Sequence, residues 1–478
     1  MRLHMRLPAV LLSLTLLFSP AQGFRPPESV YNAVRPLFTG LSWVHTAAPL
    51  ATAAGDVTSV FYSDGGIDVN VRQFPNGDVF LQCRADAADT RSVLLDGSAC
   101  QVCRCTGGKW VVTDRVQNAR DTLYITVTGG AQSYSLIVNP PLAYRSLSHD
   151  CIEALPYYSG GATVMTEYGG VRLTLNAPAC NGYAAWFVLI SAQPLIDWND
   201  PVIPRIWTNY SFSAQSRWTP AGYYYTVPKD YTPTGANVYE HTPALYVPVA
   251  FALTGGSRAA EDLATVMLDT SRAYYNNLGY FPTAAQSNWL MRDYGIGAGF
   301  YDSRFNADTA RAYLTLGRRL GISAFTDVAD RFAQFLVPFS DSHSFLFFGG
   351  TGFGRLTQDY YHPDGGKPTH VALNHQLAEI LFLYQHGSAA SVRVADAMLR
   401  GIKFNRDGWI MDDGNLHYAY LPDDSFGLKD YDYLTYNDLY ALQNELIRIK
   451  GVRDLDLDIL MRSKLWWMRK NNITGYNE

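Results

Sequence analysis

The stretch VALNHQLAEILFLYQHG, residues 371–387, joins a long apolar run to a terminal glycine. It predicts a helix over Val371 to Gln385, with Gly387 as its stop. Similar helices, each with a capping or stopping residue, are predicted at Ser257 to Asn277, from Asn306 to before Gly321, and over 324–336, 389–400, 435–449 and 455–469. Successive helices with short loops favour helical hairpins, and hairpins arranged around an axis make an incomplete (α/α) toroid.

The first half of the chain has a different pattern. Alternation with a period of two marks Ile67 to Val71 and Leu123 to Val127, and turn clusters separate such runs. The fold class expected is therefore multidomain α+β, with antiparallel β-rich domains followed by the toroid. The expected divisions are a segment to be removed (1–23), an N-terminal linker (24–56), a β-sandwich-like domain (57–140), a β-rich and connecting segment (141–235) and an α/α toroid of catalytic type (236–478).

Composition limits the class of protein. The 478 residues are 47% hydrophobic and 17% charged, which excludes a disordered chain, and the length suits two to four domains. The 32 tyrosines and 10 tryptophans are unusual. Rings with an apolar face and a polar edge suit carbohydrate clefts, although they also fill ordinary cores.

The N-terminus predicts export. Arg2 and Arg6 flank the start of an apolar run from Leu7 to Phe18, which is too short to span a bilayer, and small residues precede position 24. We expect a signal peptide cut near Gly23 and a secreted protein without a membrane span. Losing two arginines and no acids changes the net charge from −5 to −7, which does not suit a general binder of nucleic acid or anionic membranes.

The six cysteines all lie before residue 181 and predict up to three disulfides in an oxidising compartment. The alternative is zinc at Cys100, Cys103 and Cys105, but these sulfurs are crowded and no histidine is near. We expect no metal site.

Three segments between the predicted helices carry most of the polar and aromatic groups. The first is Asp293 to Asn306, whose glycines allow close backbone approach to a ligand and whose Arg304 could bind a carboxylate with two bonds. It includes Tyr301. It is no dinucleotide fingerprint, because no strand precedes it. The second runs from Gln358 to Gln376, and the third from Gly408 to Asn437, with His417 and Tyr418 within it.

The last ~120 residues resemble the C-terminal domain of the D-glucuronyl C5-epimerases. Tyr361-His362-Pro363, Pro368 and Ala372-Leu373-Asn374 are similar to a family motif that leads into a helix. Tyr418 is similar to a later loop tyrosine, and Asp432-Tyr433-Leu434-Thr435 with Asn437 to the final motif. Tyr360 and Tyr431 are the alternative positions for two of these tyrosines. The resemblance implies a β-rich part before an α/α part, in the order expected above.

The resemblance also implies an isomerase, specifically an epimerase of uronic-acid-containing polysaccharides. A base removes the proton from carbon 5, which is α to a carboxylate, and an acid returns one on the opposite face. The acid and base are expected among Tyr361, Tyr418, Tyr433, Tyr431 and Tyr360. Substrate binding and stabilisation of the enediolate are expected from Arg304, Asn374, His375, Asn437, Tyr301 and His417. No cofactor is required.

Three alternatives stay open. If the oxygen at carbon 4 leaves after proton abstraction, the same site is a polysaccharide lyase. A glycoside hydrolase of the toroid class would use two carboxylates from Asp302, Asp359, Asp412, Asp413, Asp423, Asp424 or Asp430. A non-catalytic secreted protein would use the tyrosines only to stack on a glycan.

Overall fold

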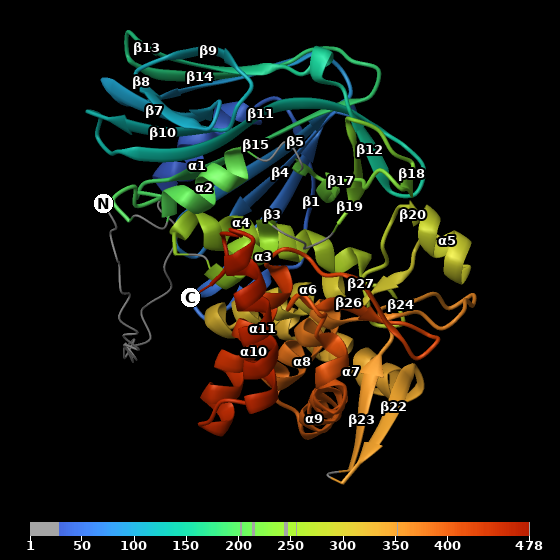
Figure 1. Cartoon of the computed structure of the whole chain (residues 1–478). Coiled ribbons are helices and arrows are strands. Elements are labelled where there is room, and N and C mark those ends of the chain that lie inside the picture. Colours follow the sequence, from blue (N-terminus) through green and yellow to red (C-terminus); the bar gives the residue numbers. More distant parts are fainter. Residues whose placement is uncertain are drawn as a thin grey trace.

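The computed structural model describes residues 28–200, 203–212, 216–242, 247–254, 256–350 and 352–477. The expected signal peptide, 1–23, lies outside these residues. A β-rich part stands above a helical part (Figure 1). No helix in the described ranges combines the length and the apolar character needed to cross a membrane.

Two antiparallel sheets face each other in the β-rich part. In the described residues the larger sheet has 14 strands, with the central order β1-β3-β4-β5-β15-β11-β12-β19-β17-β16. Its strands are β1 (Ser42–Thr46), β2 (Leu50–Thr52), β3 (Gly55–Ser63), β4 (Ile67–Gln73), β5 (Val79–Ala85), β7 (Ala99–Thr106), β8 (Lys109–Thr113), β10 (Leu123–Thr128), β11 (Tyr134–Ser146), β12 (Cys151–Ala154), β15 (Tyr183–Ser191), β16 (Ser216–Thr219), β17 (Gly222–Thr226) and β19 (Val238–His241). The smaller sheet has the order β6-β14-β13-β9, from β6 (Asp89–Leu95), β9 (Val116–Ala119), β13 (Gly161–Glu167) and β14 (Gly170–Ala177).

A core of aliphatic side chains fills the space between these two sheets. Val69 and Val71 of β4, which show the predicted alternation, pack with residues such as Val93 of β6 and Leu173 of β14. The expected domain boundary at residue 140 falls inside β11, and strands from both sides of that boundary pair in one sheet. The expected linker 24–56 also differs, because it holds α1 (Glu28–Val34), β1 and β2. The sandwich therefore extends from β1 to β15.

The helical part is an arc of helix pairs. In the described residues the helices after α1 are α2 (Ile203–Phe212), α3 (Val247–Thr254), α4 (Arg258–Ser271), α5 (Asn288–Tyr294), α6 (Ser303–Leu320), α7 (Ser323–Ser342), α8 (Leu373–His386), α9 (Ala389–Phe404), α10 (Leu434–Lys450) and α11 (Leu455–Lys470). Short connections join α6 to α7, α8 to α9 and α10 to α11, and α3, α6, α8 and α10 neighbour one another in turn. The helical part begins at Val247 and not at 236, because β19 still belongs to the large sheet.

Local signals explain most helix ends. Ser257 caps α4 by accepting a hydrogen bond from the amide of Ala260, and Gly321, Gly387 and Gly451 end their helices in the left-handed conformation. The predicted cap Asn306 is wrong. Asp302 caps α6 instead, because its carboxylate accepts from the amide of Phe305.

Short strands connect the helices. These are β18 (Tyr231–Thr232) with β20 (Gln286–Ser287), β21 (Tyr301–Asp302) with β24 (Tyr360–Tyr361), β22 (Ser344–Gly349) with β23 (Gly352–Thr357), and β25 (Val371–Ala372) with β26 (His417–Tyr420) and β27 (Phe426–Lys429). They hold the long loops before α6, α8 and α10 in place.

All six cysteines are free thiols in the structure, so the expected disulfides are not formed. Their positions explain this. Cys83 lies in the core between the two sheets, and Cys151 in a separate small cluster. Cys103 and Cys105 lie two positions apart on one strand, so their side chains point to the same face, and Cys100 points to the other. No group of three or more His, Cys, Asp or Glu in the described ranges is arranged to hold a metal ion.

Candidate functional site

The N-terminal ends of α6, α8 and α10 meet at one place. The amide of Ser303 donates to the carbonyl of Asp359 over 3.0 Å. Arg304, one residue further on, binds the carbonyl of Asn374 in α8 and the carboxylate of Asp438 in α10. The loops before these three helices therefore gather at one end of the helical part, next to strands β17 and β19.

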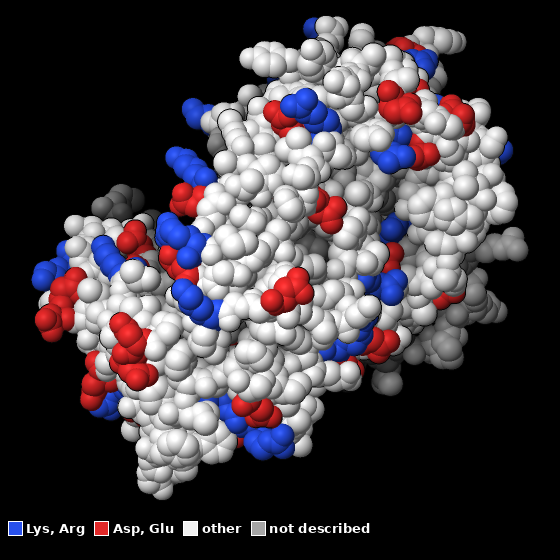
Figure 2. Space-filling model, turned by 90° about the vertical axis from the view of Figure 1, so that its right-hand side faces the viewer, with Lys and Arg blue, Asp and Glu red and all other residues white. Residues whose placement is uncertain are grey.

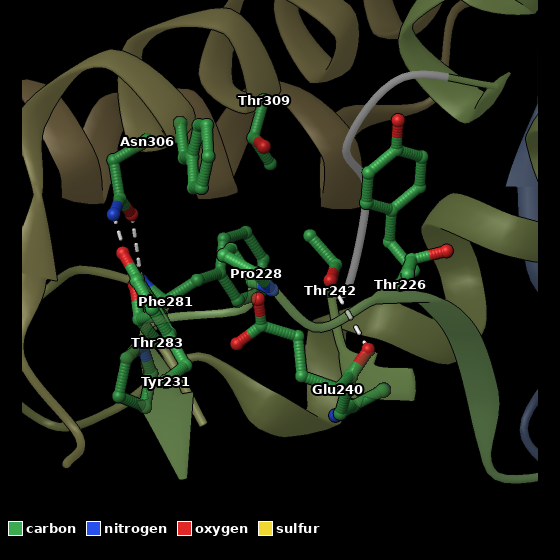
Figure 3. A pocket seen from close by; sticks show the side chains of 13 residues that line it. Thr226, Pro228, Tyr231, Glu240, Thr242, Phe281, Thr283, Asn306 and Thr309 are labelled. Carbon is green, nitrogen blue, oxygen red and sulfur yellow. Dashed lines mark hydrogen bonds between the residues drawn. The ribbon is translucent and has the colours of Figure 1, made fainter. Parts of the chain in front are cut away.

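A cavity lies where this end meets the large sheet (Figure 3). Its wall combines aromatic rings with hydroxyl and amide groups, which is the mixture that suits a sugar. The lining residues are Tyr225, Thr226, Pro228, Tyr231, Glu240, His241, Thr242, Phe281, Pro282, Thr283, Phe305, Asn306 and Thr309. The side chain of Asn306 is fixed by hydrogen bonds to both backbone groups of Phe281.

Glu240 brings a carboxyl group into this cavity from β19. The residue is 6% exposed, and one carboxyl oxygen accepts from the amide of Ala285 over 3.3 Å. Burial raises the pKa of Glu240 to about 8, and the charge of Asp302 adds to the rise. The group is therefore a proton donor at neutral pH. Burial lowers the pKa of the neighbouring His241 to about 3, so that imidazole is neutral.

Asp302 is buried at the N-terminal end of α6, and its charge acts on both Glu240 and the predicted tyrosines. Burial raises the pKa of Asp302 to about 7, while the amide of Phe305 and the Arg304 guanidinium oppose the rise. The charge of Asp302 in turn raises the pKa of Glu240, Tyr360, Tyr418 and Tyr431. Asp302 is 4% exposed and is not part of the cavity lining, but a carboxyl group with a pKa near neutrality is suited to general acid and base catalysis.

Three predicted tyrosines come together beside Asp302. The rings of Tyr418 and Tyr431 meet edge to face, 5.6 Å apart, and Tyr418 lies 6.0 Å from the ring of His370. Burial raises the pKa of Tyr360 well above its usual value, and the hydroxyl of Tyr418 raises it further. The pKa of Tyr418 is likewise raised, by burial first and then by Asp359. These hydroxyls stay protonated at neutral pH, which suits proton donors.

A neutral polar cluster lies behind the tyrosines. One oxygen of Asp359 accepts from the amide of Ala372 and lies 3.5 Å from His370 Nε2 and 3.6 Å from His375 Nδ1. His375 Nδ1 is also 3.0 Å from the hydroxyl of Ser303. Burial raises the pKa of Asp359 well above its usual value and lowers that of both histidines. The second oxygen of Asp359 has no hydrogen-bond partner among the residues that the structure describes.

The side chain of Arg304 is bound by other groups of the protein. Its guanidinium donates to Asp308 over 2.8 Å, to both oxygens of Asp438 over 2.6 and 2.9 Å, and to the carbonyl of Asn374 over 3.0 Å. The expectation of a guanidinium open to a substrate carboxylate is therefore corrected. Two acids from α6 and α10 occupy the sites that a uronate would need.

Other predicted site residues lie apart from this centre. Tyr301 is buried and donates to Glu379. Tyr361 contacts Phe339 and His343, because neighbouring residues of a strand point to opposite faces. Tyr433 is 42% exposed and lies near Gly475.

The remaining predicted binding residues also have local surroundings. Within the described part of the chain, the side-chain oxygen of Asn374 and Nδ1 of His417 are buried without a hydrogen-bond partner. The side chain of Asn437 accepts from the amide of Asn477. Of the predicted binding set, only His375 contacts the polar cluster through its side chain.

Among the candidate carboxylates for hydrolysis, Asp302 and Asp359 are both buried, and the charge of Asp302 adds to the rise that burial causes in the pKa of Asp359. Asp430 pairs with Lys464 over 2.8 Å, and Asp413 accepts from the indole of Trp467. The others are at the surface: Asp412, Asp423 and Asp424. Sequence reasoning missed Glu240, although a carboxyl group within the strand Val238–His241 is the kind of polar interruption that could have pointed to it.

No family model matches the chain, and no curated protein matches it. Among solved structures it is similar to an α-amylase from Clostridium perfringens, with 10% identity, a TM-score of 0.37 and coverage of 55% of this chain and 68% of that one. It is also similar to the unsaturated glucuronyl hydrolase from Bacillus sp. GL1, with 16% identity, a TM-score of 0.34 and coverage of 48% of this chain and 60% of that one. A third similar structure is cellobiose 2-epimerase from Spirochaeta thermophila, with 12% identity, a TM-score of 0.35 and coverage of 47% of this chain and 57% of that one. The chain spans less than two thirds of the last two proteins, and similarity this low carries no argument about activity.

Proposed function

We propose that the protein is a carbohydrate-active enzyme that moves protons to and from a sugar ring at the N-terminal end of α6. The observation that supports this most is the position of Asp302, whose pKa is raised to about 7. Its charge acts both on the carboxyl group of Glu240 in the cavity and on the hydroxyls of Tyr418 and Tyr431. Groups on two sides of one ring are what an inversion at carbon requires.

The reaction proposed is epimerisation of a uronic acid residue. Asp302 in its ionised form would take the proton from carbon 5, and a tyrosine hydroxyl or Glu240 would return one to the opposite face. The developing enediolate would accept hydrogen bonds from the protonated groups around it. Arg304 would not take this role, because it is bound to Asp308 and Asp438. The family resemblance of the Tyr418 segment supports the same reaction.

The charge distribution fits a short or partly neutral glycan better than a long polyanion. On the face shown in Figure 2, Lys and Arg side chains are interspersed with Asp and Glu over the described residues, without a broad area of one sign. Such a surface does not attract a polyuronate at long range. Recognition would instead depend on contacts within the cavity.

The test is exchange at carbon 5. Unsulfated glucuronate oligomers are incubated in deuterated water, and deuterium at carbon 5 is followed by NMR for the wild type and for Asp302→Asn, Tyr418→Phe and Tyr431→Phe. Asparagine caps a helix as well as aspartate does, so Asp302→Asn should keep α6 intact. Loss of a general acid or base should slow exchange ~10²–10⁴-fold.

Tyr168→Phe, on a fully exposed turn, is the matched control and should leave exchange unchanged. The epimerase proposal fails if the wild type exchanges no deuterium on any glucuronate oligomer. It also fails if Asp302→Asn exchanges at the wild-type rate.

A glycoside hydrolase is the second candidate, because the charge of Asp302 reaches Glu240 and the two could form a carboxyl pair. New reducing ends that depend on both carboxyl groups, without exchange at carbon 5, would identify it. A new double bond in the product would identify a lyase. Tight glycan binding without any product would indicate a binding protein.

Export is a further part of this proposal. Extracellular protein that begins near Phe24 by intact mass would support it. Protein that still carries residues 1–23 would contradict it.

A further inference from the structure

Lys464 of α11 is a charged side chain in the interior that the proposed chemistry does not use (Figure 1). It is fully buried, and its ammonium group forms an ion pair with the buried carboxylate of Asp430 over 2.8 Å. Nζ also donates to the side-chain oxygen of Asn415 over 2.6 Å and to the carbonyl of Tyr431 over 2.5 Å. An ammonium group has three N–H donors, so these three partners can occupy all of them.

The three partners belong to the two segments that carry candidate tyrosines. Asn415 comes three residues before Tyr418, at the entry to β26. Asp430 and Tyr431 follow β27 and lie just before α10. The two segments touch, since the amide of Asp430 donates to the carbonyl of Leu416 over 3.3 Å. The ammonium group therefore connects both segments to α11 at one point.

Other side chains of α11 hold the first of these segments. Ser463 donates to the carbonyl of Gly414 over 2.8 Å, and the indole N–H of Trp467 donates to Asp413 over 3.1 Å. The ring of Trp467 also lies 4.8 Å from Nζ of Lys464. Because the contacts of Ser463 and Trp467 do not depend on the ammonium group, its removal should loosen the segments without detaching them.

A buried ion pair contributes little to stability by itself. The cost of taking two ions out of water offsets most of their attraction, and apolar side chains of similar size often stabilise a fold equally well. What the ammonium group adds is direction, because its donors fix three acceptors relative to one another. The Lys464 contacts therefore point to a role in geometry.

Geometry matters here because the loop that follows is exposed. Residues 431–433 lie between β27 and α10 and are all exposed, with Tyr431 at 52%. The ring of Tyr431 meets that of Tyr418 edge to face, with centroids 5.6 Å apart, and the charge of Asp302 acts on both hydroxyls. A shift of the Tyr431 backbone would change the separation of these two hydroxyls.

We propose that Lys464 is a positioning residue, which holds the hydroxyls of Tyr418 and Tyr431 at the separation that proton transfer on a sugar ring requires. This rests on the proposed function of the Asp302 centre. Since the ammonium group is fully buried, it would act through the side chain of Asn415 and the backbone of Tyr431, without touching the substrate.

The test is the double variant Lys464→Met/Asp430→Asn, which removes both charges and so leaves no buried ion of this pair unpartnered. Carbon 5 exchange on glucuronate oligomers should show a kcat lowered about 10–100-fold and a KM close to that of the wild type. Misplaced groups slow the chemical step more than they weaken binding. The melting temperature should stay close to the wild-type value.

A double-mutant cycle separates positioning from general damage. If Lys464 acts through Tyr431, adding Tyr431→Phe to the double variant should slow exchange by less than the product of the two separate losses. Losses that multiply would show two independent effects and would overturn the proposal.

A second readout needs no activity. Tyrosines labelled with ¹³C at Cζ report the surroundings of each hydroxyl by NMR, and the two resonances are assigned through Tyr418→Phe and Tyr431→Phe. Both resonances should move in the double variant, whereas that of Tyr168, on its fully exposed turn, should not. Unmoved resonances of Tyr418 and Tyr431 would overturn the proposal.

Lys450→Met/Asp396→Asn is the matched control, because it makes the same changes in an ion pair of 3.0 Å between α10 and α9. It should leave kcat and both resonances unchanged, and an equal loss of kcat in this control would refute a special role for Lys464. If Lys464→Met/Asp430→Asn does not fold, Asn415→Ala decides, since it keeps the ion pair. The Tyr418 resonance should then move, and an unmoved one refutes the proposal.

The outcomes also separate this proposal from the proposed function. A wild type that exchanges carbon 5 protons, with a double variant of equal kcat, overturns the positioning role alone. A wild type without exchange overturns the proposed activity, and the resonances then decide the positioning. Resonances that move support the role of Lys464 in holding the two hydroxyls, and unmoved resonances overturn both proposals.

Discussion

At the residue scale, Glu240 couples the candidate site to the stability of the protein. Burial raises its pKa in the folded state to about 8, from 4.5. Between these values the folded protein keeps a proton that the unfolded chain has released. The contribution to stability is therefore complete below about pH 4.5 and is lost as the pH rises through 8.

The first prediction follows from this sign. The free energy of unfolding of the wild type should fall by about 3 kcal/mol between pH 5 and pH 8 through this group alone. Glu240→Gln, which cannot ionise, should remove that part of the slope, as measured by urea unfolding at several pH values. Glu261→Gln, on the protein surface, is the control. An unchanged slope in Glu240→Gln would show that the carboxyl group is already ionised in the fold.

At the element scale, Arg304 ties three helices together. It lies on α6, binds the carbonyl of Asn374 on α8, and forms an ion pair with Asp438 on α10. Its side chain is 14% exposed, and those of Asp308 and Asp438 are 18% and 15% exposed. Removing the cation would take its partner from the largely buried Asp438 and leave Asp308 with the longer contact to Arg311, over 3.4 Å, which costs more than the pairs themselves contribute.

Arg304→Ala should therefore lower the free energy of unfolding by about 3–5 kcal/mol. Arg292→Ala is the control, since its pair with Asp293 is at the surface and 72% of the Arg292 side chain is exposed. It should cost at most about 1 kcal/mol. Any residual activity of Arg304→Ala should fall equally for charged and neutral sugars. If Arg304→Ala lost activity on uronates alone, with its stability unchanged, Arg304 would be shown to bind the substrate carboxylate.

At the scale of the whole molecule, one core joins the sheet to the helices. Phe80, Phe187 and Trp218 from the large sheet belong to the same buried cluster as Leu263 of α4 and Leu377 of α8. Two ion pairs cross the same boundary, Arg72 with Asp269 over 2.9 Å and Arg258 with Asp78 over 2.5 Å. The β-rich and helical parts are thus expected to support each other.

This shared core predicts one cooperative thermal transition. Calorimetry should give a single peak, with equal midpoints by near-ultraviolet and far-ultraviolet circular dichroism. A fragment that begins at residue 247 should not fold, because it exposes the apolar side chains that face the sheet. Two separated transitions, or a folded fragment, would show that the parts are independent domains.

The sequence by itself determined the elements whose signals are local. Stops at Gly321, Gly387 and Gly451 were predictable, because a left-handed C-terminal residue depends only on neighbouring backbone. The alternation at the start of β4 likewise reports burial on one face of the strand, where Ile67, Val69 and Val71 are buried. Tyr418 and Tyr431 could be named from their loops, although not their closeness to Asp302.

Only the tertiary structure decided what depends on distant partners. Asp438, which pairs with Arg304, lies 134 positions further along the chain, and no local sequence pattern predicts such a pair. Pairing of β21 with β24 placed Tyr360, and not Tyr361, beside Tyr418. Glu240 became part of the cavity because β19 joins the sheet next to α6. A carboxyl group acquires its raised pKa from burial by residues remote in sequence, and burial is a property of the folded chain.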